Sequence, residues 1–323
     1  MGSNTLMSAA IGGAGIRPFA PGRSIDELWV DPAGSNNYGL KSLSLDRPLA
    51  TITRAIALAE STAGIYNRSA VIHVAPGEYR EFVDVTKPDI AIIGSSGRYP
   101  GRTRIVGDGA TARATMRVLT GNLRGFTLAN VLVETGFPGT TSLAVPAIFL
   151  ETSDTAELGA NSTDEHFLLD NVMVISDGTP NAGLLLGGAT MGRVQNSTFA
   201  GCEHGVVFAG SANNNPTDIR FHNIDFYNNT TADVATSSAT PPTVTLGSVG
   251  GMDSIIWSDT NFCDVGGTPV TNYINLVGAQ VNGSFFNCRF NRAVSDGTLT
   301  LLPVGVNIIA SYDVNGHVNI VGA

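Results

Sequence analysis

The sequence predicts an all-β fold, a parallel β-helix (solenoid) capped at its N-terminal end by one α-helix. One amphipathic helical pattern, at residues 48–60, is followed by short apolar runs bounded by glycine or proline, as in strands. A short motif then recurs between residues 128 and 290 at the spacing of solenoid coils. The 323 residues include 43% hydrophobic side chains, which is enough for a continuous core.

The N-terminal elements follow from apolar spacing and from the residues that bound each run. Residues 28–30 form a short strand before a loop rich in turn residues. The helix is predicted from apolar residues at helical spacing and from a proline suited to its first turn: Leu49, Ile52, Ile56, Ala59 and Pro48. Three further strands are expected at 70–75, 89–94 and 103–107.

The repeated motif is an apolar residue, any residue, Asn or Asp, two residues, then Phe or Val. Its polar position is occupied by Asn130, Asn171, Asn196, Asn223, Asp259 and Asn287, at spacings of 41, 25, 27, 36 and 28 residues. The shorter spacings match one coil, and the longer ones a coil with an inserted loop. Because Asn tolerates left-handed backbone, we expect these residues at a bend, bonded to their neighbours above and below. The aromatic ends of the motif predict one internal stack of Phe199, Phe226, Phe262 and Phe290.

Three segments are predicted along the chain. Residues 1–24 form an arm rich in glycine, alanine and proline, without the pattern of a secretory signal. Residues 25–295 form the β-helix with its capping helix at 48–60. Residues 296–323 form strands that close the solenoid or make subunit contacts, and Asn315-Gly316 predicts a type I′ hairpin turn there. The arm and the apolar C-terminal stretch favour a homo-oligomer, with a trimer preferred.

Composition excludes several classes of partner. The chain has 18 Lys and Arg residues against 27 Asp and Glu residues, a net charge of −9, and no basic run, so we expect no nucleic-acid partner. No run of about 18 apolar residues occurs, so we expect no membrane partner. Cys202, Cys263 and Cys288 are too few for a disulfide framework, and the five histidines lack zinc-site spacing. We therefore predict no metal and no cofactor.

The N-terminal layout resembles that of a known superfamily. The resemblance is carried by five stretches in order: LWVDPAGSNNYG, RPLATITRAIALAE, AVIHVAPGEYREFVDV, DIAIIGSSG and TRIVG. They resemble the opening of the pectin-lyase-like right-handed parallel β-helix superfamily, with Pro76-Gly77-Glu78-Tyr79 at its characteristic turn. The resemblance covers roughly residues 28–300 and implies a right-handed coil. The superfamily includes polysaccharide lyases, hydrolases and esterases, and also non-catalytic phage tailspike and capsid-surface proteins, so the fold does not decide the activity.

The catalytic sets of two enzyme groups in this superfamily have no full counterpart here. The pectin methylesterases resemble the N-terminal layout most closely, but their Gln-Asp-Thr and Asp-Phe-Ile-Phe-Gly stretches are missing from the sequence. Polygalacturonases need paired carboxylates. Residues 203–210, which include Glu203 and His204, loosely resemble their histidine stretch, but residues 178–202 contain no Asp or Glu.

Pectate lyases need clustered carboxylates for calcium and a basic residue that takes a proton. Asp253, Asp259 and Asp264 lie close in sequence, but no Arg or Lys occurs between Arg220 and Arg289. We therefore assign no catalytic residue.

Other candidate residues are weighed against ordinary structural roles. Asp164-Glu165-His166 could ligate a metal or act in acid–base chemistry, and a solvated loop is the favoured interpretation. Around the coil that holds Asp218, His222 and Asp225, strand alternation places His222 and Asp225 on opposite faces, which argues against a dyad. Aromatic residues could form a sugar-stacking platform, although core packing is more common for such residues: Trp257, Tyr227 and Tyr273.

Two functional hypotheses follow. The main one is a non-catalytic virion structural protein of a tailed phage, a capsid decoration or tail-associated β-helix at the virion surface. In it, the arm contacts capsid or tail proteins. The alternative is a polysaccharide-degrading or glycan-binding β-helix, tailspike-like, with carboxylates on the insertions at 134–168 and 227–256 and a host surface glycan as partner.

Overall fold

The computed structural model describes most of the chain from residue 25 to residue 322. The described residues are 25–38, 46–66, 69–95, 103–107, 113–118, 125–135, 146–151, 166–176, 182–187, 191–209, 216–236, 252–264, 270–276, 281–294 and 299–322. The predicted arm at 1–24, together with Asp164 and Glu165, lies outside them. No helix in the described ranges is long and apolar enough to cross a membrane.

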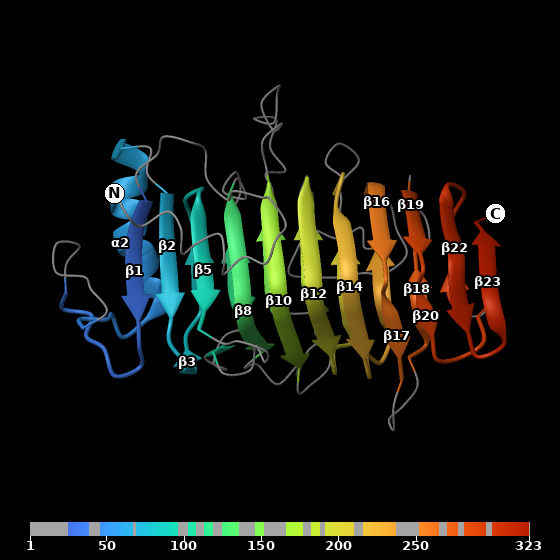
Figure 1. Ribbon diagram of the computed structural model, residues 1–323, viewed down its shortest axis with the longest axis horizontal. Helices are drawn as coiled ribbons and strands as arrows, with labels where there is room; N and C mark the ends of the chain where they lie inside the picture. The colour runs from blue at the N-terminus through green and yellow to red at the C-terminus, as the bar shows by residue number, and fades with distance from the viewer. Residues whose placement is uncertain are drawn as a thin grey trace.

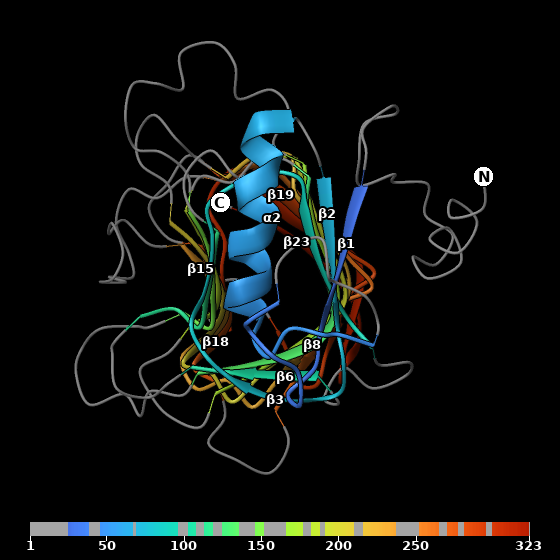
Figure 2. The same ribbon diagram turned by 90° about the vertical axis from the view of Figure 1, so that its left-hand side faces the viewer.

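The strands stack into a long solenoid whose coils follow one another from the N-terminal to the C-terminal end (Figure 1). Viewed along its axis, the solenoid has three walls (Figure 2), which we call the first, second and third faces. A 15-stranded sheet forms the first and second faces, and an 8-stranded sheet forms the third. All pairings inside the coils are parallel, as the sequence predicts for a β-helix.

Each coil runs through the first, second and third faces in turn. The first face contains β1 (Ile25–Val30), β2 (Ser69–Val74), β5 (Ile90–Gly94), β16 (Met252–Ser258) and β19 (Val281–Phe286). The second contains β3 (Gly77–Arg80), β6 (Thr103–Val106), β17 (Asn261–Cys263) and β20 (Arg289–Phe290). Longer strands span both: β8 (Phe126–Thr135), β10 (Phe167–Ser176), β12 (Gly192–Ala200), β14 (Arg220–Tyr227) and β22 (Val306–Asp313). The third contains β4 (Val83–Val85), β7 (Met116–Val118), β9 (Ile148–Glu151), β11 (Ala182–Gly187), β13 (His204–Phe208), β15 (Ala232–Thr236), β18 (Asn272–Asn275) and β21 (Thr300–Leu301).

A left-handed residue forms the corner between the first and second faces. All six polar positions of the repeated motif have φ between 52° and 57°, as predicted for a bend. The predicted side-chain contacts between coils are present for three of the five successive pairs: Asn171 donates to Asn130 at 2.8 Å, and Asn223 donates to Asn196 at 3.0 Å. Asn287 donates in the same way to Asp259. These amides bond across coils because equivalent corners stack directly on one another.

The interior is a continuous column of apolar side chains. The predicted stack is confirmed, with ring centroids 5.8 Å apart for Phe199 and Phe226 and 5.2 Å for Phe226 and Phe262. Phe290 continues it at 4.7 Å from Phe262. The close approach of the rings to the third face requires small residues there, since a Cβ at Gly205 would lie 2.6 Å from Phe226.

Helix α2 (Ile52–Tyr66) covers the N-terminal end of the interior, where the sequence places a cap (Figure 2). The predicted start at residue 48 is wrong, because Leu49 forms a parallel bridge with Val30 and so belongs to extended chain. Thr51 ends that segment, and its hydroxyl accepts the Arg54 N–H at 3.2 Å as an N-cap.

A carboxylate from the first coil completes the start of the helix. The two oxygens of Glu81 accept the N–H groups of Ile52 and Thr53, each at 2.8 Å. An anion at this end is favoured by the helix dipole. Gly77 lies in the turn that precedes Glu81. Its φ is 153°, and a Cβ at this position would lie 2.4 Å from Pro32 Cγ, so a side chain has no space there.

The C-terminal residues extend the solenoid and then reverse direction. β21 and β22 pair with β18 and β19 in parallel, and β23 (Gly316–Val321) pairs with β22 antiparallel. The predicted hairpin is therefore present, but its turn is one residue earlier, because Asp313 pairs with Gly316. Asn315 has no positive φ, so the predicted type I′ turn is wrong. Asp313 Oδ1 accepts the Asn315 N–H at 2.7 Å and holds the turn instead.

Candidate functional site

An open groove lies on the outer side of the second face, over β10, β12, β14, β17 and β20. Its volume is about 530 Å³. Two preceding coils contribute Met173, Thr198 and Ala200 to its lining. Most of its polar side chains come from the next three coils toward the C-terminal end: Asp225, Tyr227, Asn261, Cys263, Arg289 and Asn291. We refer to it as the groove.

The corner residues position these side chains. Asp225, Asn261 and Arg289 each follow a left-handed corner by two residues and lie opposite one another in register. The next residue in each strand is a phenylalanine of the internal stack. Tyr227 and Cys263, one residue further on, face outward again and are also in register. The periodicity of the motif therefore places aromatic side chains inside and polar ones in the groove.

The groove holds a carboxylate, a guanidinium and an aromatic ring with room for a ligand. Asp225 Oδ1 accepts the side-chain amide of Asn261 at 2.7 Å, which leaves its other oxygen available. Within the described residues, the side chain of Arg289 has neither an ion pair nor a hydrogen bond. Tyr227 is 41% exposed. Adjacent strands thus present a guanidinium cation, hydrogen-bond acceptors and the face of an aromatic ring to a ligand.

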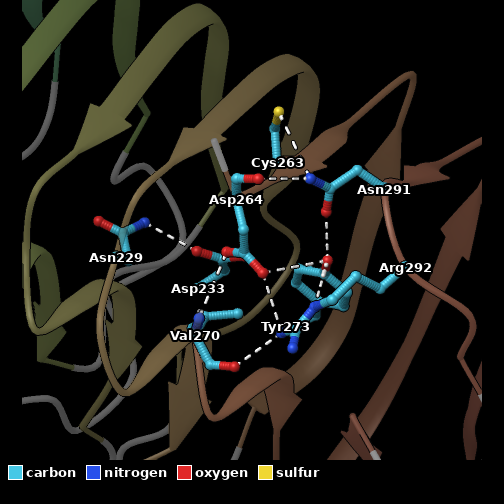
Figure 3. Close-up of polar contacts among 8 residues, drawn as sticks. All are labelled: Asn229, Asp233, Cys263, Asp264, Val270, Tyr273, Asn291 and Arg292. Carbon is cyan, nitrogen blue, oxygen red and sulfur yellow. Dashed lines mark hydrogen bonds and ion pairs between the residues drawn. The ribbon is translucent and has the colours of Figure 1, made fainter. Parts of the chain in front are cut away.

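A network of polar side chains borders the groove where the second face turns to the third (Figure 3). Arg292 Nη2 lies 2.9 Å from Asp264 Oδ2, and its Nε donates to the Tyr273 hydroxyl at 3.1 Å. Nη2 also donates to the carbonyl of Val270 at 2.7 Å. The guanidinium lies 5.1 Å from the centre of the Tyr273 ring. These contacts hold Arg292 in one position.

The network also fixes Asn291, which lines the groove. Its Nδ2 donates to the Asp264 carbonyl at 2.8 Å, and its Oδ1 accepts the Tyr273 hydroxyl (Figure 3). Burial raises the pKa of Tyr273, so this hydroxyl stays protonated at neutral pH and remains a donor. Asn291 is therefore presented to the groove in a fixed orientation.

A buried carboxyl group lies behind this network. Asp233 is 1% exposed, and Asn229 Nδ2 donates to its Oδ1 at 2.8 Å (Figure 3). Its Oδ2 is buried and has no partner within the described chain. Burial raises the pKa of Asp233 well above 3.8, which favours the neutral form of the carboxyl group. Asp233 does not line the groove.

The three cysteines are free thiols with limited reactivity. Burial raises the pKa of Cys202 and of Cys288 to about 12. Cys263 lines the groove, and burial followed by the nearby Asp264, Asp225 and Asp233 raises its pKa as well. A thiol with a raised pKa is a poor nucleophile, because the thiolate is the reactive form.

The predicted alternation of His222 and Asp225 is wrong. Both side chains are exposed on the outside, because the left-handed Asn223 between them shifts the alternation by one residue. They do not form a dyad, however. His222 Nδ1 contacts Ser258 Oγ at 3.0 Å and Asp259 Oδ2 at 3.2 Å, while Asp225 contacts Asn261.

The remaining carboxylate candidates are not brought together. Asp253 accepts from Asn282 at 3.1 Å, whereas Asp259 and Asp264 take part in separate contacts already described. Asp218 is exposed, and so is His166 at the start of β10. No group of three or more His, Cys, Asp or Glu within the described ranges could hold a metal ion.

Two of the three aromatic candidates belong to the core. Trp257 and Tyr273 are 0% exposed, so they cannot form a sugar-stacking platform, and Tyr227 remains as the exposed ring. The Trp257 ring stacks between two phenylalanine rings, with centroid distances of 3.7 Å to Phe221 and 5.6 Å to Phe285. His204 is also buried, and burial lowers its pKa to about 4.

Three groove residues were not among the sequence candidates. Asn261, Arg289 and Asn291 lie two or four residues after a corner position. The signal for them is therefore present in the repeat, because the same offset in each copy marks an outward side chain.

Comparison with known proteins identifies solved structures with a similar fold. No family model matches the sequence, and no curated protein matches it. Among solved structures, a rhamnogalacturonan lyase matches with a TM-score of 0.59 and 8% identity over 90% of this chain and 74% of that chain. Escherichia coli YbhC matches with a TM-score of 0.52 and 12% identity over 97% of this chain and 80% of that chain. A rice weevil pectin methyl esterase matches with a TM-score of 0.49 and 11% identity over 90% and 84%.

The chain is a right-handed parallel β-helix. The two neighbours with TM-scores above 0.5, the rhamnogalacturonan lyase and YbhC, confirm the resemblance at the level of fold. These neighbours give no support to the phage virion subtype. At such low identities the likeness concerns the fold, and function has to be argued from the groove.

Proposed function

We propose that this β-helix binds a polysaccharide, and that the groove is its binding site. The observation that carries the proposal is the row of Asp225, Asn261 and Arg289 on three neighbouring strands, with the exposed ring of Tyr227 beside it. Neighbouring strands lie about 4.8 Å apart, so the row offers polar groups at a regular spacing. A chain of sugar rings, with hydroxyl groups along its length, can bond to such a row.

The chemistry of the groove suits a polar ligand with apolar faces. Carboxylate and amide oxygens accept hydrogen bonds from hydroxyl groups, and the Arg289 guanidinium donates several. The ring of Tyr227 presents an apolar face to a pyranose. Asn291 enters this set already oriented by the network behind it, which lowers the entropy lost on binding.

Binding without cleavage is the form of the proposal that the titratable groups favour. The strongly shifted carboxyl, Asp233, and the shifted hydroxyl of Tyr273 are buried outside the groove, and the thiol of Cys263 has a raised pKa. None of them is suited to act as a base or nucleophile on a bound glycan. One structural neighbour is a rhamnogalacturonan lyase, which agrees with a polysaccharide ligand in broad class.

Affinity electrophoresis of the full chain tests the proposal, with soluble rhamnogalacturonan, polygalacturonate or dextran cast into the gel. At least one polysaccharide should retard the protein, and R289Q should lose most of that retardation. R54Q, an equal loss of charge at the exposed Arg54 on α2, should behave as the unchanged protein. Absence of retardation by all three, or equal retardation of R289Q and R54Q, would contradict the proposal.

The virion role stays a separate prediction. It rests on residues 1–24, which lie outside the described residues, and no observation in the structure favours it. Light scattering of the full chain and of a variant lacking residues 1–24, with and without isolated particles, tests it together with the predicted trimer. Oligomers that bind particles through the arm would support the role, and monomers that ignore particles would count against it.

A further inference from the structure

Two arginines lie side by side on the outer side of the first face. Arg193 on β12 and Arg220 on β14 are partners in register. Arg193 is half-buried and Arg220 is exposed. Neighbouring strands are about 4.8 Å apart, and like charges directly opposite one another destabilise a sheet. The pair therefore needs an explanation in a chain whose net charge is −9.

Neither arginine is neutralised by another described residue. The side chains of Arg193 and Arg220 make no ion pair and no hydrogen bond within the part of the chain that the structure describes. Other arginines do have carboxylate partners: Arg80, Arg104, Arg113, Arg117 and Arg292. Two guanidinium groups thus remain available at one place.

The surroundings offer donors and apolar contacts. In the same cross-strand row, Arg193 is followed on one side by the buried Leu168, and Arg220 on the other by Ile256, which is 42% exposed and offers the apolar contact. Two residues further along β12, Gln195 faces the same side and can donate through its amide. The acidic side chain of this row, Glu27 on β1, lies five strands away from Arg193, and none lies between Val71 and Ser284.

Two nearby carboxylates, Asp170 in the neighbouring row and Asp259 at the corner, have side-chain partners of their own. Asp170 Oδ1 accepts the side-chain amide of Asn196 at 2.9 Å. Asp259 Oδ2 lies 3.2 Å from His222 Nδ1. Neither carboxylate forms an ion pair with Arg193 or Arg220 among the described residues.

We propose that Arg193 and Arg220 together bind a tetrahedral oxyanion, a sulfate or phosphate group carried by a ligand. A guanidinium engages two oxygens through its fork, so one arginine satisfies a carboxylate. Two forks side by side match a group with three or more oxygens. The site lies on the first face, around the corner from the groove, and it does not depend on what the groove binds.

Thermal unfolding of the full chain tests this inference. Sulfate, phosphate or acetate replaces chloride at constant ionic strength, and bound anion raises Tm by mass action. Sulfate and phosphate also stabilise proteins in general, so the site is measured as the difference between variants. The unchanged protein and R54Q should show the same Tm rise in sulfate or phosphate. R220Q and R193Q should lose part of it, and acetate should not separate the variants.

A second readout separates a binding site from a structural role. In dilute chloride, R220Q should raise Tm because it removes a like-charge contact, whereas loss of a structural arginine lowers Tm. The two anions are distinguished by pH, since inorganic phosphate gains its second charge as pH rises toward neutrality and sulfate keeps the same charge. Equal anion-dependent Tm rises in R220Q and R54Q would overturn the proposal, and so would a lower Tm of R220Q in chloride.

Discussion

Asn171 Nδ2 donates to Asn130 Oδ1 across 2.8 Å, joining two coils at the same corner. The two residues also share a left-handed backbone, with φ of 53° and 57°. The corner thus performs two functions, because it turns the chain between two faces and, at three of the five steps between successive corners, also bonds one coil to the next. It also sets which side chains point outward into the groove.

Substitution at a corner separates these two functions. Asn223→Ala should lower the free energy of unfolding by about 1–2 kcal/mol, since alanine is strained in left-handed backbone and the amide contact to Asn196 is lost. Asn223→Gly loses the same contact but tolerates the conformation, so its loss should be smaller. Urea unfolding measures both. Equal losses for the two variants would show that backbone conformation is not the main term.

Truncation of the stacked core should be costly. Trp257→Ala removes a fully buried ring between Phe221 and Phe285, and a loss of about 3–5 kcal/mol is expected. Trp257→Phe should cost less, because the indole N–H is buried without a partner in the described chain and its removal leaves no unmet donor. Phe286→Ala, at a ring 50% exposed, is the control and should change stability by about 0.5 kcal/mol or less. Urea unfolding of the three variants measures these losses of unfolding free energy.

His204 should contribute to acid unfolding. Its pKa is lowered by burial from 6.5 to about 4, so its stabilising contribution is complete above pH 6.5 and is lost as pH falls toward 4. The loss amounts to at most about 3 kcal/mol. His204→Gln should therefore show a weaker decline of unfolding free energy between pH 6.5 and 4. His317→Gln, at an exposed site, should keep the original decline.

Asp233 should act in the opposite direction. Its pKa is raised well above 3.8 by burial, so stability is complete below pH 3.8 and falls as pH rises through the folded-state pKa. Asp233→Asn cannot ionise, so its stability relative to the unchanged protein should increase with pH. Unfolding free energies of D233N and of the exposed control D218N, measured from pH 4 to pH 8, test this. A constant difference between D233N and the unchanged protein would contradict a raised pKa.

The parallel β-helix could be predicted from the sequence because each copy of the repeat marks both a corner and an interior position of a coil. The Asn and Asp positions mark the corners, and the phenylalanines three residues later mark the interior. The start of α2 was mispredicted, since a proline suits both a first helical turn and an extended segment. The bridge between Leu49 and Val30, which decides between them, joins residues far apart in sequence.

The groove was harder to predict than the fold. Simple alternation placed His222 and Asp225 on opposite faces, because it ignores the shift caused by a left-handed corner. With that shift included, Asp225, Asn261 and Arg289 fall on one outer row. The network of Asp264, Tyr273 and Arg292 has no such signal, since it forms between turns of different coils.

A crystal structure of the full chain with an oligosaccharide from the polysaccharide that binds most tightly tests the central claim most directly. The sugar should lie over β14, β17 and β20, with one ring against Tyr227 and polar contacts to Asp225 and Arg289. Sugar bound on another face, with the groove empty, would contradict it.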